Sequence, residues 1–240
     1  MGEYQPMVHP DHAARIRRWH ERVYVERSPA AAQTVDHLGL TLVVPPEVHP
    51  INRMSHLLGD AVRAGVRPGE RVLDMGTGCG VNGILAAVAG ARVVAVDTNP
   101  VAVQAAKDNA ARNGATVDVR RGDLFDGVDG LFDLVIFDPP FRWFPARDLL
   151  ETASTDPGYA TLTRFFREVR GRLTASGRLL LSFGTTGDLP YLQKLSAEAG
   201  FATVTVGHDT LTRDGWTVDY YAFRLTPHES SGVAPSSHGS

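Results

Sequence analysis

The tetrapeptide Asp138-Pro139-Pro140-Phe141 directly follows the apolar run 134–137, and its residue types suit the binding of a planar nitrogen. The lone pair of an amide or aromatic amine is delocalised, which makes the nitrogen a poor nucleophile. The Asp138 carboxylate and the Pro139 carbonyl can accept its N–H groups and pull the nitrogen toward a pyramidal shape. Proline adds no competing N–H and stiffens the turn, while Phe141 can stack on the planar group. The same triplet also suits an ordinary strand-ending turn, because Asp and Pro favour turns.

A glycine-rich turn lies about sixty residues upstream, where the apolar run 72–73 leads into Asp74, Gly76, Gly78 and Gly80. Glycines without a Cβ allow a ligand to approach the backbone closely. The helix that should follow offers free N–H groups at its amino terminus. Asp74 begins the turn and can either hold the loop geometry or face a cationic ligand. The pattern predicts a site for a nucleotide-like cofactor.

Two further acidic residues stand where such a cofactor needs acceptors. Asp97 closes the next expected strand about 20 residues later, where a carboxylate can bind ribose hydroxyls. Asp123 follows the third expected strand and can accept from an exocyclic adenine amine. The run Gly78-x-Gly80-x-x-Gly83 also satisfies the dinucleotide pattern of nicotinamide and flavin enzymes. The acidic residue before the first glycine and the later Asp-Pro-Pro-Phe argue against that alternative, and a turn that binds no ligand is the remaining one.

The elements that position these residues alternate between strands and helices. Expected helices include one between Asn99-Pro100, an N-cap followed by proline, and Asn113-Gly114, a fitting stop signal. Such alternation predicts a parallel sheet with helices on both faces. No helix fits between the last two strands, and Asp214-Gly215 signals a hairpin there, so we expect an antiparallel edge. The seven expected strands are Arg71–Met75, Arg92–Asp97, Thr116–Arg120, Phe132–Phe137, Arg178–Phe183, Phe201–Gly207 and Thr217–Leu225.

Three zones divide the chain. Residues 1–65 are expected to form a short cap over the substrate opening, residues 66–226 the α/β domain, and residues 227–240, rich in Ser, Gly and Pro, a disordered tail. Within the cap, a helix over 11–27 places Ile16, Trp19 and Val23 on one stripe. A strand over 38–44 and a helix over 52–64 follow, and two later helices are expected over 159–173 and 189–199.

Bulk composition restricts the class of protein. The chain of 240 residues has a net charge of −3, which lacks the strong basic footprint of many nucleic-acid binders. A single cysteine, Cys79, excludes an internal disulfide and fits a reducing cytosol. The polar amino terminus carries no h-region, so we expect no secretory signal, and no apolar run approaches the roughly 20 residues of a membrane helix. We therefore expect a cytoplasmic protein that does not contact a membrane.

The runs 72–80, 93–100 and 138–141 resemble the class I S-adenosylmethionine-dependent methyltransferases in order and spacing, over about residues 50–225. The last run has the form "(N/D)PP(Y/F)" of members that methylate nitrogen. The chain looks most like the release-factor glutamine methyltransferase and "methyltransferase small domain" group, because the run 39–50 is similar to the segment before the fold there. It differs in Asp138, where the group has Asn, and over 51–55, where the group has an acidic stretch. Both differences bear on the glutamine substrate and leave cofactor use unaffected.

The resemblance implies a Rossmann-like, doubly wound seven-stranded sheet that binds S-adenosyl-L-methionine. Its cofactor residues would be Asp74, Gly76, Gly78, Gly80, Asp97 and Asp123, and its catalytic residues Asp138, Pro139 and Phe141. The expected reaction is N-methylation of a planar amide or amine in a small molecule or protein side chain. A nucleobase in RNA or DNA is the alternative acceptor, followed by a nicotinamide-dependent oxidoreductase and by a cofactor-binding protein without transfer activity.

Weaker signals have ordinary structural interpretations. His9, His12 and His20 lack the cysteine or acidic partners of a tetrahedral metal site, so we predict surface histidines and no metal. The arginines of the first helix are expected on its solvated side. For Trp143 and Phe144, a wall of the substrate site and packing under the loop are equally favoured. Tyr220 and Tyr221 are expected to pack on the sheet.

Overall fold

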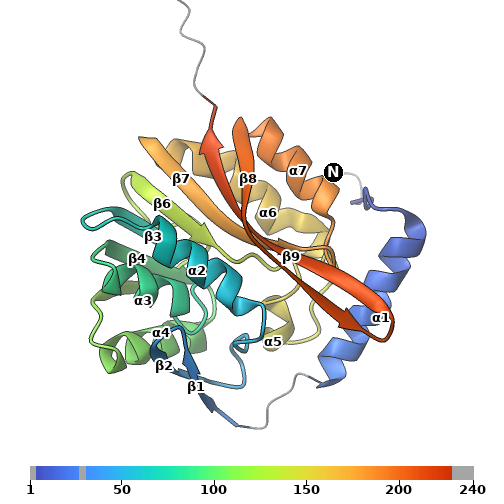
Figure 1. The fold of residues 1–240 in the computed structure, drawn as a ribbon, viewed down its shortest axis with the longest axis horizontal. Coiled ribbons are helices and arrows are strands. Elements are labelled where there is room, and N and C mark those ends of the chain that lie inside the picture. The colour runs from blue at the N-terminus through green and yellow to red at the C-terminus, as the bar shows by residue number, and fades with distance from the viewer. Residues whose placement is uncertain (1–3, 27–30, 229–240) are drawn as a thin grey trace, which may run out of the picture.

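The computed structural model describes residues 4–26 and 31–228. Seven strands form one sheet in the order β5-β4-β3-β6-β7-β9-β8, and β1 and β2 form a separate antiparallel pair (Figure 1). The strands are β1 (Gln33–His37), β2 (Leu40–Val44), β3 (Arg71–Met75), β4 (Arg92–Asp97), β5 (Val117–Arg121), β6 (Phe132–Phe137), β7 (Leu173–Gly184), β8 (Phe201–Arg213) and β9 (Trp216–Pro227). The helices are α1 (Pro10–Glu26), α2 (Ser55–Gly65), α3 (Val81–Val88), α4 (Pro100–Arg112), α5 (Leu149–Thr152), α6 (Ala160–Val169) and α7 (Leu189–Glu198).

The sheet is mixed, as the sequence predicts. Strands β3 to β7 pair in parallel, whereas β9 runs antiparallel to both β7 and β8. Helix α4 begins where expected, since the Asn99 side chain accepts the Val101 N–H at 2.9 Å, and Gly114 follows its end with a φ of +65°. These features confirm the predicted fold class.

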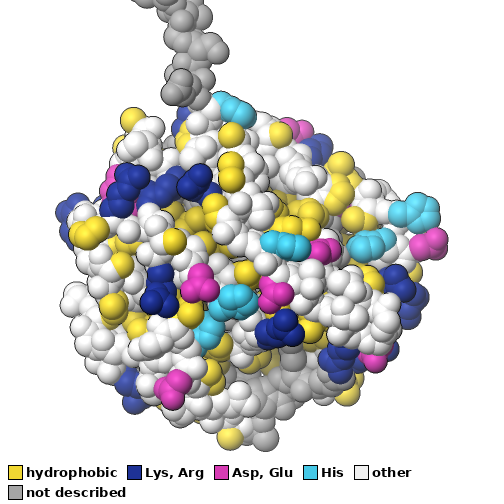
Figure 2. Space-filling model, in the orientation of Figure 1, with side chains coloured by type: hydrophobic (Ala, Val, Ile, Leu, Met, Phe, Trp, Pro, Cys, Tyr) yellow, Lys and Arg dark blue, Asp and Glu magenta, His cyan; other side chains and the backbone are white. Residues whose placement is uncertain are grey.

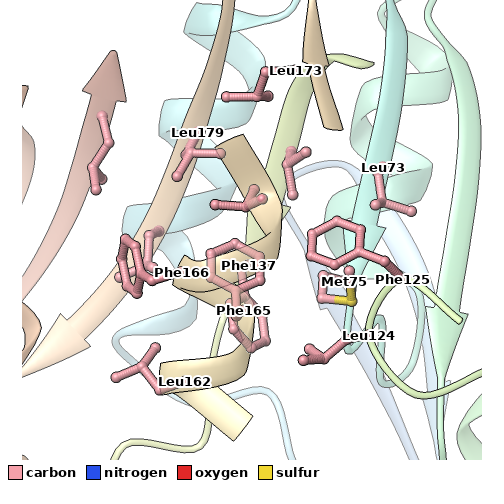
Figure 3. Close-up of a cluster of buried hydrophobic side chains, with 14 of the residues drawn as sticks. Leu73, Met75, Leu124, Phe125, Phe137, Leu162, Phe165, Phe166, Leu173 and Leu179 are labelled. Atoms are coloured by element: carbon pink, nitrogen blue, oxygen red, sulfur yellow. The ribbon is translucent and has the colours of Figure 1, made fainter. Parts of the chain in front are cut away.

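Alternate residues of the strands fill two separate cores. Leu73, Val135 and Phe137 point to the face covered by α6 and α7, where rings of Phe125 and Phe165 pack among them (Figure 3). Their strand neighbours point to the opposite face, against α2, α3 and α4. Because both faces are buried, the central strands are continuous apolar runs rather than alternating ones. The carboxyl ends of these strands are thereby held in one rigid row.

The first zone is built from three separate pieces. The stripe of Ile16, Trp19 and Val23 on α1 is buried, as expected. Strand β2 starts at Leu40 rather than Leu38, because Leu38 and Gly39 form a hairpin turn with positive φ angles. That turn joins it to β1, which the sequence analysis missed. Helix α2 packs on the sheet itself, within the same core as α3 and α4.

The β8–β9 hairpin is longer than expected and extends past the sheet. Strand β8 continues to Arg213 instead of ending at Gly207, and β9 pairs with β7 only over Tyr220–Leu225. The projecting part, residues 208–219, which we call the arm, lies beside α1 (Figure 1). Val218 of the arm packs against Trp19 and Val23 of α1. The expected tail over 227–240 lies mostly outside the described residues.

Candidate functional site

One cavity of about 730 Å³ lies at the carboxyl edge of the sheet. Met75 on β3 pairs with Val96 on β4 and with Phe137 on β6, so the residues that follow these three strands are neighbours. Ligands bind at this edge in open α/β sheets, and the volume is typical of a small-molecule site. Of the predicted site residues, Gly76, Gly78, Asp97, Asp123, Asp138, Pro139 and Phe141 line the cavity.

The glycine turn after β3 has a backbone that only glycine adopts easily. Gly76 and Gly78 have φ angles of +63° and +56°. A Cβ on either would meet protein atoms only at 3.7 Å or beyond, so both border open space. Gly80 differs, because its Cβ would lie 3.1 Å from Ala106 of α4. Gly76 and Gly78 thus form a cradle for a ligand, while Gly80 allows close packing of two helices.

Asp74 lies beneath the turn and does not line the cavity. Its side chain is 2% exposed and accepts the Thr77 hydroxyl at 2.6 Å and the Gly83 N–H at 2.9 Å through the same oxygen. Burial raises the pKa of this carboxyl to about 7. Of the two roles expected for Asp74, the geometry favours support of the loop.

Asp97 and Asp123 stand at the next two strand ends. Asp97 accepts the Gly78 N–H and the Asn99 N–H, each at 2.9 Å, which joins the first turn to the second strand. Burial raises the pKa of its carboxyl. Asp123 is more open, with a side chain that is 56% exposed and that binds Arg164 at 2.7 Å. Both carboxylates therefore border the cavity, but Asp97 is the more firmly held.

Asp138 follows β6 and faces the cavity from the neighbouring strand end. Surrounding protein atoms raise the pKa of its carboxyl, and a hydrogen bond from the Ser182 hydroxyl opposes that shift. Ser182 is positioned by the sheet, because Phe137 pairs with Leu181 on β7. The sequence analysis missed Ser182, although the strand register would have placed it beside Asp138.

The rest of the cavity wall comes from segments far apart in the sequence. Phe141 packs against Phe183 at 5.2 Å and Tyr220 at 6.5 Å between ring centroids. Tyr220 and Tyr221 line the cavity besides packing on the sheet, a role that the sequence analysis missed. Other walls come from α1, the loop before α2 and the arm, through Trp19, Val23, Arg53, Leu211 and Arg213.

The packing beside this wall shows where His20, Trp143 and Phe144 lie. His20 is not a surface residue, because it is 3% exposed and its Nε2 lies 2.7 Å from Glu151. Trp143 and Phe144 pack against each other and under the loop, and neither lines the cavity. Among the described residues, no group of three His, Cys, Asp or Glu side chains is arranged to hold a metal ion.

Residues 50–210 match the family model of the methyltransferase small domain. The chain belongs to this family. Its members are class I S-adenosylmethionine-dependent methyltransferases, which confirms the predicted family and cofactor. The cradle at Gly76 and Gly78 and the carboxylate of Asp97 fit that cofactor, since they offer open backbone and a fixed acceptor at adjoining strand ends.

Individual relatives act on different acceptors. The ribosomal RNA small subunit methyltransferase C of Chromohalobacter salexigens is 34% identical over 187 residues, 74% of this chain and 51% of that protein. A protein of Methanocaldococcus jannaschii, provisionally named a protein N5-glutamine methyltransferase, is 31% identical over 65% of this chain and 83% of its own. The ribosomal protein L11 methyltransferase of Thermosipho africanus is 51% identical over 72 residues, 30% of this chain and 28% of that protein.

Solved structures share the fold at lower identity. The T. thermophilus 16S rRNA methyltransferase in complex with AdoMet and guanosine has a TM-score of 0.59 and 22% identity, and covers 83% of this chain and 52% of that chain. The chain spans about half or less of the length of the first curated relatives. None of the helices in residues 4–26 and 31–228 combines the length and apolar character needed to cross a bilayer.

Proposed function

We propose that this domain transfers a methyl group from S-adenosylmethionine to a planar nitrogen. The observation that carries the proposal is the position of Asp138, a cavity-facing carboxylate one strand away from the glycine cradle. A donor in the cradle and an amine beside Asp138 would occupy adjoining strand ends. Gly76, Gly78, Asp97 and Asp123 are the proposed cofactor contacts, whereas Asp74 and Gly80 shape the loop.

Asp138, Pro139 and Phe141 are the proposed catalytic residues. When bound, the cofactor would supply an electrophilic methyl group on its sulfonium, and an in-line attack would form the new N–C bond as the C–S bond breaks and S-adenosylhomocysteine leaves. The ionised Asp138 carboxylate and the Pro139 carbonyl accept the N–H groups and localise the nitrogen lone pair. Phe141 stacks on the planar group, and the product proton passes to Asp138 or to solvent. Most of the rate would come from positioning the nitrogen.

The preferred acceptor is a small molecule or a protein side-chain amide. Trp19 and Val23 of α1 and Leu211 of the arm cover part of the cavity from outside. A single planar group can enter beneath this cover more easily than a folded surface can. Acidic, basic and histidine side chains alternate near the centre of the face in Figure 2, with no continuous basic patch there. This pattern favours a compact acceptor over a long polynucleotide.

A nucleobase is the second candidate, supported by the aromatic lining of the acceptor side. Phe141, Tyr220 and Tyr221 could enclose a flipped base, and Arg53 and Arg213 border the same cavity. The relatives that act on ribosomal RNA add to this candidate. Binding of RNA through these arginines would weaken steeply with salt.

The test measures transfer of a labelled methyl group from S-adenosylmethionine to a panel of acceptors. The panel contains glutamine peptides, ribosomal protein L11, guanosine, and ribosomal RNA at low and high salt. We expect an N-methyl product, identified by mass spectrometry, and a rate that rises with pH as the Asp138 carboxyl ionises. An O- or C-methyl product would overturn the nitrogen assignment. Calorimetry that shows no binding of S-adenosylmethionine or S-adenosylhomocysteine to folded protein would overturn the whole proposal.

A further inference from the structure

The carbonyl at the end of the Asp-Pro-Pro-Phe turn is held by a residue outside the cavity. The Tyr159 hydroxyl donates to the Phe141 carbonyl oxygen at 2.6 Å. Tyr159 precedes α6, is fully buried, and does not line the cavity. Its contact with the turn is therefore made from behind, on the side away from any bound acceptor.

The Tyr159 hydroxyl is oriented by a second hydrogen bond. It accepts the Asp188 backbone N–H at 2.7 Å, so its own proton is left to point at Phe141. Burial raises the pKa of Tyr159 well above its ordinary value, which keeps the hydroxyl a donor. Tyr159 also has a φ of +54°, a left-handed conformation that is costly for a residue with a Cβ. Such conformations persist where the surroundings over-determine them and cluster at functional sites.

Asp188 connects the same network to the beginning of the described chain. Its fully buried carboxylate accepts the Tyr4 hydroxyl at 2.6 Å and the Met7 N–H through one oxygen. The Tyr4 ring packs edge-on against Tyr159, at 5.2 Å between centroids. Residues before α1 thereby hold the loop after β7, and that loop holds Tyr159.

Gly187 brings this loop unusually close to the turn. A Cβ at Gly187 would lie 2.3 Å from the Phe141 carbonyl oxygen and 2.9 Å from the Phe183 ring. Contacts that short do not occur, so any larger residue would displace the turn. The Phe141 carbonyl oxygen is therefore fixed by a hydrogen bond from Tyr159 and by the close approach of the Gly187 backbone.

We propose that Tyr159 is a positioning residue for methyl transfer, which sets the Asp138–Phe141 turn through the Phe141 carbonyl, with Asp188 and Tyr4 as its anchors. The inference rests on the proposed function, because the turn is the proposed acceptor site. It predicts that the hydroxyl of a residue that touches neither cofactor nor acceptor controls the rate of transfer. The amino-terminal residues would thus be part of the catalytic scaffold as well as a cover.

The decisive comparison is Tyr159→Phe against Tyr191→Phe. Tyr191 lies in the same cluster, stacked on Tyr159 at 5.2 Å, but its hydroxyl pairs with Thr163 at 2.9 Å and does not reach the turn. Each variant loses one hydrogen-bonded hydroxyl, on a buried side chain at Tyr159 and on a half-buried one at Tyr191. We expect Tyr159→Phe to lower kcat about tenfold to hundredfold, as small misplacements of reacting groups do. Its KM and its affinity for S-adenosylhomocysteine should stay close to wild type, and Tyr191→Phe should change none of these.

A spectroscopic readout tests the inference without any acceptor. The protein is labelled with ¹³C at the Phe carbonyls and with ¹⁵N in Arg. An NMR spectrum that detects only ¹⁵N bonded to a ¹³C carbonyl then shows signals from its three Phe–Arg pairs alone. Replacing the exposed Arg167 and Arg224 by Lys leaves the pair 141–142 alone. We expect Tyr159→Phe to shift that carbonyl signal, Tyr4→Phe to shift it less, and Tyr191→Phe to leave it in place.

The outcomes separate the two proposals. A wild-type protein that transfers no methyl group, with the carbonyl shift as expected, would contradict the proposed function and leave the contact at Phe141 intact. An unshifted carbonyl, or a wild-type kcat in Tyr159→Phe, would overturn the role of Tyr159. If Tyr159→Phe fails to fold, Tyr4→Phe provides the second route: it removes one anchor of Asp188, so it should shift the same carbonyl and reduce kcat, and a wild-type result for both would also overturn the inference.

Discussion

The cofactor half and the acceptor half of the cavity are built in different ways. The cofactor half consists of consecutive strand ends, and its polar side chains bind the backbone of the same unit, as Asp97 does with Gly78 and Asn99. The acceptor half takes its walls from α1, the loop before α2, the turn after β6 and the arm. Its polar groups reach across the chain, as Ser182 does to Asp138.

From this difference we expect the cofactor half to be common to the family and the acceptor half to vary from one protein to another. A site made of adjoining strand ends depends on local turn chemistry, so it can be common to proteins that differ elsewhere. A site made of distant segments can change whenever one segment changes. The names of three relatives describe ribosomal RNA, a ribosomal protein and glutamine as acceptors, which is the variation that this division predicts.

The strongest test of the division is Asp138→Ala. We expect turnover to fall about a hundredfold to a thousandfold, the usual cost of removing one preorganised catalytic group. The affinity for S-adenosylhomocysteine, measured by calorimetry, should change by less than about threefold, because the cradle does not depend on Asp138. Ser182→Ala is the matched control and should cost less, since it leaves the carboxylate in place. Full activity in Asp138→Ala would contradict the proposed mechanism.

The pH dependence of stability tests the support beneath the cradle. Burial raises the pKa of Asp74 from 3.8 to about 7 in the folded protein. The folded protein therefore binds the proton of Asp74 more tightly than the unfolded chain does. This contribution to the free energy of unfolding is fully present below about pH 4 and is lost as pH rises through about 7. Asn at this position stays neutral and can accept the same two hydrogen bonds. At about 1.4 kcal/mol per pKa unit, Asp74→Asn should gain up to about 4 kcal/mol over wild type between pH 4 and 8.

Urea unfolding at a series of pH values measures this gain, with Asp108→Asn on the exposed side of α4 as the control. The affinity of Asp74→Asn for S-adenosylhomocysteine should remain near that of wild type. A large loss of affinity would show that Asp74 contributes to cofactor binding beyond its two hydrogen bonds to the loop.

Four of the six residues predicted to bind the cofactor line the cavity, because their signals in the sequence are local, whereas Asp74 and Gly80 lie behind the turn. The stop at Gly114, the turn glycines and the acidic residues at strand ends all appear within short segments, and the structure has them at the expected strand ends. For the acceptor half, the sequence predicted only the Asp-Pro-Pro-Phe turn. Ser182 required the β6–β7 register, which no single segment contains.

The length of the β8–β9 hairpin is the clearest case of information absent from local patterns. Residues 208–213 are polar or half-buried, and no core signal marks them as strand. They remain strand because Val218 of the arm is buried against Trp19 and Val23, some two hundred residues away in the sequence, with Leu211 partly buried beside them. His20 was assigned to the surface for the same reason, since its partner Glu151 lies on a helix that no motif indicates.

Within the cofactor half, we expect Asp97 to contribute more to cofactor affinity than Asp123. Asp97→Ala should weaken S-adenosylhomocysteine binding about tenfold to hundredfold, because it removes one acceptor for the cofactor, and one charge-assisted hydrogen bond is worth about 1.5–3 kcal/mol. The loss of its hydrogen bonds to Gly78 and Asn99 should appear mainly in stability. Asp123→Ala should cost less, since that side chain is 56% exposed and already paired with Arg164. Calorimetry of both variants measures the difference. Equal losses of affinity would mean that cofactor binding does not depend on how rigidly hydrogen bonds hold the carboxylate.

The smallest expected effect tests whether the arm belongs to the acceptor half. Val218 is fully buried between the arm and α1, so Val218→Ala should destabilise the protein by about 1–2 kcal/mol. Val204, which is 47% exposed on the same hairpin, supplies the control Val204→Ala. Loosening the arm moves Leu211 and Tyr220, which line the cavity. We therefore expect a rise of about threefold to tenfold in acceptor KM, with S-adenosylhomocysteine affinity unchanged. A loss of cofactor affinity of similar size would mean that the two halves fold as one unit and that the division between them is wrong.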